Sequence, residues 1–221
     1  MLELTLNKRP VSPLKVLCIG AHSDDIEIGC GGTVLRLAQD HDNMEVLWVV
    51  LSSGSGRDRE ARASARMFLR GVRRKTVVVK DFRNGFFPYV GCEIKEFFER
   101  LKSEIDPDVV FTHYRNDLHQ DHRVACELTW NTFRNHLILE YEVPKYDGDL
   151  GAPGFFVPLT EALCRRKVRY LLSAFATQSD KHWFAAETFM GLMRLRGVEA
   201  AAREKFAEAF YCRKVVLGSM L

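Results

Sequence analysis

Residues 15–40, KVLCIGAHSDDIEIGCGGTVLRLAQD, decide the fold, because they read in succession as a buried strand, a polar turn and a helix. The run KVLCIGA (15–21) is almost continuously apolar, as is typical of a parallel strand covered on both faces. The segment GGTVLRLAQD (31–40) has helical periodicity. Between them stand a histidine and two adjacent aspartates, whose like charges repel unless a cation, a proton or open water accompanies them.

The same alternation recurs along the first half of the chain. Further apolar runs are MEVLWVVLSS (44–53), KTVVVKDF (75–82) and PDVVFTHY (107–114). Helical segments separate them at 58–72 and 92–107. Strands that alternate with helices form βαβ units. The sequence therefore predicts an α/β fold with a Rossmann-like, doubly wound, mostly parallel sheet and helices on both faces.

The second half has a looser pattern. We expect a helix over 122–137, a strand over 138–144 and a long surface loop over 144–158, where Gly, Pro and Asp are frequent. A helical C-terminal part follows at 159–175 and 182–209, with an edge strand at 210–218. Because no repeat, low-complexity tract or linker interrupts the chain, we predict a single domain over 1–221 with an N-terminal extension of about residues 1–14.

Composition narrows the range of partners and compartments. The net charge is +3, from 32 basic and 29 acidic residues, which gives no electrostatic reason to expect nucleic acid as a partner. The six cysteines form no CxxC pair and are expected to be buried free thiols, as suits a reducing compartment. The sequence has no signal-peptide h-region and no apolar stretch long enough to cross a bilayer. We therefore expect a cytoplasmic protein.

A second polar cluster, HYRNDLHQDHR (113–123), begins at the end of the fourth predicted strand. In open parallel sheets, ligands bind at the carboxyl ends of the strands, so we expect both clusters at one edge. Together they offer His22, Asp25, His119 and His122. Imidazoles and a carboxylate around an open position are typical of a catalytic zinc, which lowers the pKa of bound water to roughly 7.

Simpler interpretations exist for these residues. Asp24 or Asp25 could cap the helix that follows, although capping needs only one of them and leaves His22 unexplained. The glycines of GCGG (29–32) are expected to let the backbone turn tightly near a bound group, but GCGGT is not the GxGxxG of nucleotide-binding folds.

The two clusters resemble the motifs of the LmbE-like or PIG-L-like zinc-dependent N-acetylglucosaminyl deacetylases. That family has AHPDDE, then a glycine pair, and later DxHxDH, and this chain has AHSDDIEIGCGG and DLHQDH. The resemblance implies that His22, Asp25 and His122 bind zinc, or another divalent transition metal such as Fe²⁺. It also implies a hydrolase that removes acetyl groups from N-acetylated amino sugars, as free sugars or glycoconjugates.

The resemblance implies roles for four further residues. Asp24 would be the general base, and His119 would hydrogen-bond or protonate the reacting groups. Asp121 would orient an imidazole, with His119 as the preferred partner. Arg57, three residues before Glu60, resembles the family's substrate-binding arginine.

The chain departs from the family pattern at two places. Ser23 stands where the family has proline, which we expect to loosen the turn slightly without loss of metal. The acidic position after the aspartate pair holds Ile26, with Glu27 next. His113 and His182 could also reach the site, although core packing or solvent exposure is the simpler interpretation for them.

Two other function classes stay open at this point. One is a non-catalytic nucleotide-binding domain of the same fold class. The other is a magnesium-dependent phosphohydrolase, which the histidines disfavour because magnesium prefers oxygen ligands. The loop 144–158 and the following helices are expected to set substrate choice, and a homo-oligomer is compatible with the sequence.

Overall fold

Seven strands form one sheet in the computed structural model, which describes residues 3–6 and 12–216. The strand order is β3-β2-β1-β4-β5-β7-β6, in which β1 to β5 are parallel and β7 and β6 are antiparallel to their neighbours. The strands are β1 (Leu14–Gly20), β2 (Met44–Val50), β3 (Arg74–Val79), β4 (Val109–His113), β5 (Leu137–Tyr141), β6 (Phe155–Leu159) and β7 (Phe206–Cys212). The predicted doubly wound, mostly parallel sheet is confirmed.

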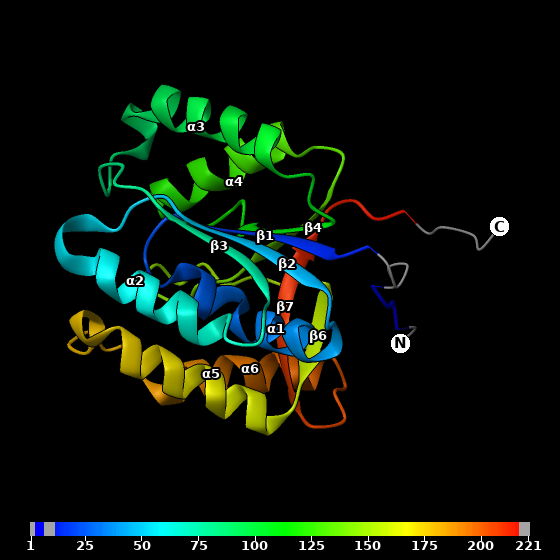
Figure 1. Cartoon of the computed structure of the whole chain (residues 1–221). Helices are drawn as coiled ribbons and strands as arrows, with labels where there is room; N and C mark the ends of the chain where they lie inside the picture. Colours follow the sequence, from blue (N-terminus) through cyan, green and yellow to red (C-terminus); the bar gives the residue numbers. More distant parts are fainter. Residues whose placement is uncertain (1–2, 7–11, 217–221) are drawn as a thin grey trace.

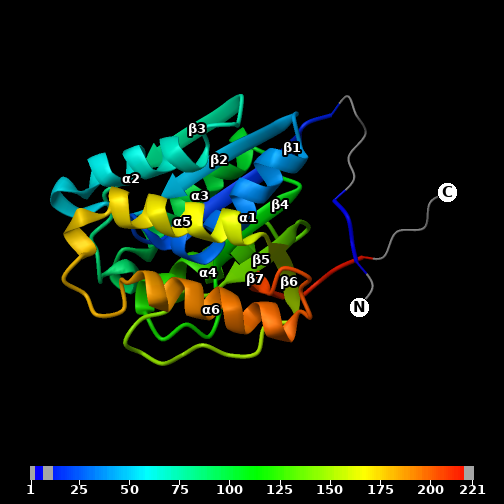
Figure 2. The same cartoon turned by 90° about the horizontal axis from the view of Figure 1, so that it is seen from below.

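Helices cover both faces of this sheet (Figure 1). They are α1 (Asp25–Asp40), α2 (Gly54–Phe68), α3 (Gly91–Glu104), α4 (Gln120–Thr132), α5 (Glu161–Ala174) and α6 (Ala186–Glu199), with short 3₁₀ helices η1 (Phe87–Tyr89) and η2 (Ala176–Gln178). α3 and α4 lie on one face, and α1 and α2 lie on the other (Figure 1). α5 and α6 are the outer helices on the second face, where α5 packs against α1 and α2 (Figure 2).

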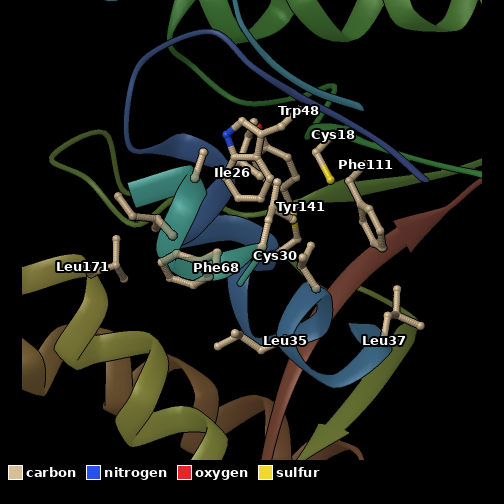
Figure 3. Packing of buried hydrophobic residues seen from close by; sticks show 14 of the residues in the cluster. Cys18, Ile26, Cys30, Leu35, Leu37, Trp48, Phe68, Phe111, Tyr141 and Leu171 are labelled. Atoms are coloured by element: carbon tan, nitrogen blue, oxygen red, sulfur yellow. The ribbon is translucent and has the colours of Figure 1, made fainter. Parts of the chain in front are cut away.

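The strands are continuously apolar because each face of the sheet has its own buried core. Cys18 of β1 points into the α1/α2 side, where Trp48, Phe68 and Tyr141 gather (Figure 3). Its neighbour Leu17 points into the α3/α4 side. Successive side chains of a strand alternate between faces, so a strand buried on both faces needs an apolar residue at every position.

The order of the strands reverses beside β1, which lies between β2 and β4. The connections to α1 and α2 leave the sheet on one face, and those to α3 and α4 on the other (Figure 1). At such a switch point the loops after the two central strands diverge and leave a crevice at the carboxyl edge of the sheet. The loops after β1 and β4 carry the two polar clusters whose residues predict a metal site.

The helix α1 begins earlier than the sequence predicted. It starts at Asp25 rather than near residue 31, so the glycines of GCGG lie inside the helix and make no turn. They allow close packing instead: a Cβ on Gly29 would lie 2.1 Å from the Tyr141 ring, and one on Gly31 would lie 2.5 Å from Phe68. The apolar face of α1 thereby approaches both the sheet and α2.

The C-terminal part differs from the prediction in three ways. The sequence predicts a loop over 144–158, but β6 begins within this stretch at Phe155. The helix expected over 182–209 ends at Glu199, where Ala201 (φ 48°) and Lys205 (φ 67°) turn the chain back into β7. The strand β7 is not an edge strand, because it lies between β5 and β6, and residues 217–218 of the predicted strand lie outside the described residues.

Two further predictions concern membrane-spanning segments and the state of the cysteines. No helix among them is long and apolar enough to cross a membrane. The cysteines are free thiols, of which Cys18, Cys30, Cys126 and Cys164 are buried as expected, whereas Cys92 is exposed. Of the predicted N-terminal extension, residues 1–2 and 7–11 lie outside the described residues, and β1 begins at Leu14.

Candidate metal centre

Three predicted metal ligands lie together at the carboxyl edge of the sheet. His22 follows β1, Asp25 is the first residue of α1, and His122 lies in the first turn of α4. His22 Nδ1 is 3.2 Å from His122 Nε2 and 3.3 Å from Asp25 Oδ2. His122 Nε2 is 3.5 Å from Asp25 Oδ1. The sequence therefore brings together side chains from two chain segments 100 residues apart.

These separations match the spacing of ligands around a tetrahedral ion. Zinc binds imidazole nitrogen at about 2.0–2.1 Å, so two of its tetrahedral ligand atoms lie roughly 3.3–3.4 Å apart. Asp25 and His122 are almost fully buried, and the His22 side chain is 12% exposed. Two imidazoles and one carboxylate surround this point, and His22 gives it access to solvent. Such an arrangement suits a metal that keeps one coordination position open for water or substrate.

The electrostatics of the three groups also suit a cation. Burial on its own lowers the pKa of His22, but the carboxylates of Asp25 and Asp121 outweigh it and raise the pKa to about 10. Burial opposes the ionisation of Asp25, yet His122, His113 and His22 hold its pKa well below the usual range. Burial and the adjacent His113 lower the pKa of His122 to about 3. The buried imidazoles and the Asp25 carboxylate therefore shift one another's pKa values strongly, and the carboxylates favour positive charge at His22.

The opposite nitrogen of each imidazole contacts a buried carboxylate. His122 Nδ1 lies 2.8 Å from Asp117 Oδ2, and His22 Nε2 lies 3.1 Å from Asp121 Oδ2. Asp121 also accepts hydrogen bonds from the backbone N–H groups of Gly85 (2.6 Å) and Phe87 (3.1 Å). Carboxylates placed behind metal-binding histidines fix the ring orientation and leave the other nitrogen free to bind.

The prediction that Asp121 orients His119 is therefore wrong in its choice of imidazole. The Asp121 carboxylate contacts His22, whereas His119 only accepts the backbone N–H of Asp121 at Nδ1 (3.2 Å). His119 is the N-cap of α4, and its ring stands edge-on to His22 with centroids 4.9 Å apart. The partly buried His119 has a pKa below its ordinary value, chiefly because of desolvation and next because of the positive charge of His22.

Asp24 lies beside the centre and pairs with Arg57 from the first turn of α2. Arg57 Nη2 donates to Asp24 Oδ1 over 3.0 Å. Burial raises the pKa of Asp24, while the Arg57 guanidinium opposes that rise. Glu60, one turn along α2, accepts hydrogen bonds from the N–H and hydroxyl of Thr177. The predicted Arg57–Glu60 segment and the 176–178 segment therefore meet at the same side of the site.

Sequence reasoning gave too little weight to His113. This last residue of β4 is fully buried and stacks on His122, with ring centroids 3.9 Å apart. Its Nε2 accepts the backbone N–H of Ala21 (2.9 Å) and lies 3.2 Å from Asp25 Oδ2. His113 is the last residue of a buried strand, at the edge of the sheet where ligands bind. That position in the sequence could have predicted that His113 lies at the site.

Sequence reasoning missed Lys145 altogether. Its ammonium lies 3.0 Å from Asp117 Oδ2 and 2.6 Å from Asp149 Oδ2, with the lysine side chain 8% exposed. Asp149 in turn accepts the N–H of Leu118. The loop after β5 is thereby joined by ion pairs and a hydrogen bond to the carboxylate that contacts His122.

Two other predicted positions do not join the donor set. Glu27 is fully buried on α1, and neither carboxylate oxygen has a hydrogen-bond partner among the described residues. Burial holds the pKa of Glu27 well above its ordinary value. His182 is exposed in the turn between η2 and α6. Four histidines do converge, because both His22–His119–His122 and Asp25–His113–His122 have ligand atoms within 4.8 Å of one another.

Residues 17–133 match the family described as PIG-L, GlcNAc-PI de-N-acetylase. The chain is also 30% identical over 139 residues to the uncharacterized deacetylase YaiS of Escherichia coli (strain K12), covering 58% of this chain and 74% of YaiS. The chain therefore belongs to the PIG-L family. The sequence-based assignment to an N-deacetylase family of hydrolases is confirmed.

Solved structures share the fold at low sequence identity. The conserved protein TT1542 of Thermus thermophilus superposes with a TM-score of 0.72 at 22% identity, over 94% of this chain and 98% of that one. The N,N'-diacetylchitobiose deacetylase of Pyrococcus horikoshii gives 0.65 at 21% identity, over 90% and 83%. GalB, a 4-carboxy-2-hydroxymuconate hydratase of Pseudomonas putida KT2440, gives 0.68 at 18%, over 94% and 99%. Because a hydratase shares this fold, the reaction must be argued from the site.

Proposed function

We propose that this protein is a divalent-metal-dependent hydrolase that removes the acetyl group from an N-acetylated amino sugar, either free or part of a glycoconjugate. The observation that carries the proposal is the spacing of His22 Nδ1, His122 Nε2 and the Asp25 carboxylate, which lie 3.2–3.5 Å from one another. Membership of a de-N-acetylase family supports the same reaction class. The similar chitobiose deacetylase acts, by its name, on an N-acetylated sugar.

The donor set fits zinc, with Fe²⁺ as the alternative, better than magnesium. Two imidazole nitrogens and one carboxylate are borderline ligands that suit transition metals, whereas magnesium requires oxygen ligands in octahedral geometry. A divalent cation bound by His22, Asp25 and His122 would take the place of the proton that the nearby carboxylates favour on the His22 imidazole. Such a cation would supply Lewis acidity, because it lowers the pKa of water and polarises a carbonyl group.

Asp24 is proposed as the general base. Arg57 holds one carboxylate oxygen of Asp24 at 3.0 Å, which leaves the other oxygen to accept a proton from the attacking water. The water oxygen forms a bond to the acetamide carbon, and the C–N bond then breaks as the nitrogen takes up that proton. Acetic acid and the free amine leave, and the acid then ionises to acetate by transferring its proton to the amine or to water.

His119 is proposed to stabilise the oxygen that becomes negative during the attack. Its Nδ1 accepts the Asp121 N–H, so the proton of the neutral ring lies on Nε2 and can be donated outward. A donor aimed at developing charge is commonly worth 10²–10³-fold in rate, by mutational comparison of oxyanion sites. Asp121 would act through His22, whose ring it orients, and Arg57 would contact substrate hydroxyls as well as Asp24.

Acetate release from N-acetylglucosamine and its glycosides tests the proposal. The protein is stripped with a chelator and reloaded with Zn²⁺, Fe²⁺ or Co²⁺ before the assay. We expect activity only after reloading, with Asp24→Asn inactive but still able to bind metal. Absence of acetate from every acetylated amino sugar with each metal would refute the proposed reaction.

The competing interpretation as a nucleotide-binding domain predicts a different result. In that case an added nucleotide raises the melting temperature and a chelator has no effect. Our proposal predicts the reverse, namely a lower melting temperature after metal removal and no shift with nucleotide.

A further inference from the structure

Lys145 is a buried lysine that the proposed chemistry does not use. It lies on the loop 142–154, which connects β5 to β6, and its side chain is 8% exposed. An ammonium group is costly to bury unless carboxylates pair with it. The Lys145 ammonium has two such partners, Asp117 at 3.0 Å and Asp149 at 2.6 Å. Because Asp117 lies on the loop after β4, the lysine joins two loops at the carboxyl edge of the sheet.

The Asp117 carboxylate is held at both of its oxygens. Its Oδ1 accepts the backbone N–H of His119 over 2.8 Å, and its Oδ2 lies close to both His122 Nδ1 and Lys145 Nζ. Arg123 also reaches this turn, but it donates to the backbone carbonyl of Asp117. Among the described residues, Lys145 is the only lysine or arginine that pairs with this carboxylate. The position of the oxygen that faces His122 therefore depends on Lys145.

The carboxylate on the other side of the centre is held in a different way. Asp121 contacts His22 and accepts hydrogen bonds from the backbone N–H groups of Gly85 and Phe87. In the described part of the chain, no lysine or arginine pairs with Asp121. Backbone donors remain whichever side chains are present, whereas an ammonium group belongs to one residue. The orientation of His122 thus depends on a single side chain from a distant loop, and that of His22 does not.

Lys145 is itself fixed by a closed ring of contacts. Asp149 Oδ2 pairs with Lys145 and also accepts the N–H of Leu118, the residue after Asp117, over 2.7 Å. Gly148 has a φ of 62°, a left-handed conformation that glycine adopts without strain, and it turns the chain so that Asp149 comes back to Lys145. If the loop 142–154 leaves this position, Asp117 loses its cation and the Leu118 N–H loses its acceptor.

We propose that Lys145 is a positioning residue of the metal centre, which holds Asp117 where it fixes the His122 ring, and that metal binding in turn stabilises the loop 142–154. The inference rests on the proposed metal dependence. Its two parts describe one coupling between sites. If release of the loop weakens metal binding by some factor, the metal must favour the docked loop by the same factor.

The sign of the change in zinc affinity separates positioning from a simple effect of charge. An ammonium group repels a divalent cation, so removal of Lys145 would strengthen zinc binding if only its charge mattered. Loss of a group that fixes a metal-binding histidine has the opposite effect and weakens binding by about 10–100-fold. Lys145 acts one contact further from the metal than Asp117. We therefore expect Lys145→Met to weaken zinc binding by about tenfold, the lower end of that range.

Zinc competition titrations of the purified protein measure this change and its route. Lys145→Arg keeps a cation that can pair with both carboxylates, so it should restore zinc affinity to within about threefold of the wild-type value. In an Asp117→Asn background, Lys145→Met should change zinc affinity by less than about twofold, because the group through which it acts is absent. A purely structural role for Lys145 would give the same loss in both backgrounds.

Lys167→Met is the matched control. Lys167 is also a buried lysine with a carboxylate 2.6 Å away, but its ammonium contacts Glu208 and the Ile28 carbonyl, which do not belong to the candidate metal centre. This variant should lower the melting temperature of the metal-free protein and leave the zinc affinity of the folded protein within about twofold. The melting temperature of each metal-free variant shows whether it is folded.

Hydrogen exchange of the wild-type protein tests the same coupling without any substitution. Zinc should slow amide exchange in the loop 142–154 by up to about tenfold, as reciprocity requires. It should leave exchange in the turn 200–205, between α6 and β7, unchanged. In the Lys145→Met variant, zinc should give the loop no added protection.

The inference is overturned if Lys145→Met binds zinc more tightly than the wild type, or equally well, or loses as much affinity in the Asp117→Asn background. It is also overturned if zinc binds the wild-type protein without slowing exchange in the loop. A wild-type protein that binds no zinc refutes the proposed metal centre together with this inference. Acetate release by the zinc-loaded wild type, with unchanged zinc affinity in Lys145→Met, refutes the positioning role alone.

Discussion

Replacement of Asp117 by asparagine removes the carboxylate charge that contacts His122 and that we propose orients its ring. Asp117 Oδ2 lies 2.8 Å from His122 Nδ1 and 3.0 Å from Lys145 Nζ, and its side chain is 3% exposed. Loss of a carboxylate behind a metal-bound histidine typically weakens metal binding or activity by about 10–100-fold, which is about 1.4–2.7 kcal/mol. We expect the upper half of that range, because both partners are buried and the orienting charge is poorly screened.

A zinc competition titration against a chromogenic chelator measures this change. The melting temperature of the metal-free protein, recorded alongside, reports any loss of folded structure. Asp147→Asn is the control, since Asp147 is exposed on the loop after β5 and should leave zinc affinity unchanged. A folded Asp117→Asn variant that binds zinc within about twofold of the wild-type affinity would refute the proposed orienting role, because such a change is only about 0.4 kcal/mol.

Three further substitutions have distinct expected results. Asp24→Asn should keep zinc affinity while kcat falls by about 10²–10⁴-fold, and a simultaneous loss of zinc would contradict its proposed role as base. Lys167→Met should lower the free energy of unfolding by about 3–5 kcal/mol in urea, because it leaves the Glu208 carboxylate buried without the ammonium 2.6 Å away; a loss below about 1 kcal/mol would contradict this. Glu27→Gln should become more stable relative to wild type as the pH rises above about 5, by up to about 1.4 kcal/mol per pH unit. The reason is that burial raises the pKa of Glu27 in the folded protein, so folding of the wild type requires a proton that becomes scarcer as the pH rises. A stability difference that does not change with pH in the metal-free protein would contradict this.

The parallel part of the fold could be predicted because its strands are buried on both faces. β1, β2 and β4 read as continuous apolar runs for that reason. β6 was not predicted because its sequence contains Pro158 and follows several glycines. The proline is tolerated in this strand because β6 is the outermost strand and pairs with β7 alone. The residues of β7 include the helix-prone AEA, and its place inside the sheet depends on partners far away in the chain.

The convergence of the candidate ligands could be predicted because strand ends in a doubly wound sheet converge. His22, Asp25 and His122 lie together for that reason, and the family motifs had marked them as candidates. The pairing of carboxylates with imidazoles could not be predicted from neighbouring residues. Asp121 is two residues from His119 in the sequence, yet its carboxylate contacts His22. Lys145 has no motif at all, since its role arises only when the loop after β5 folds back onto Asp117.

A crystal structure of the zinc-loaded protein, with anomalous diffraction recorded on both sides of the zinc edge, tests the central claim most directly. We expect one strong anomalous peak about 2.0–2.2 Å from His22 Nδ1, His122 Nε2 and an Asp25 oxygen, with Asp24 outside the coordination sphere. A peak held by other residues, or no peak in protein that binds zinc stoichiometrically in solution, would contradict the account.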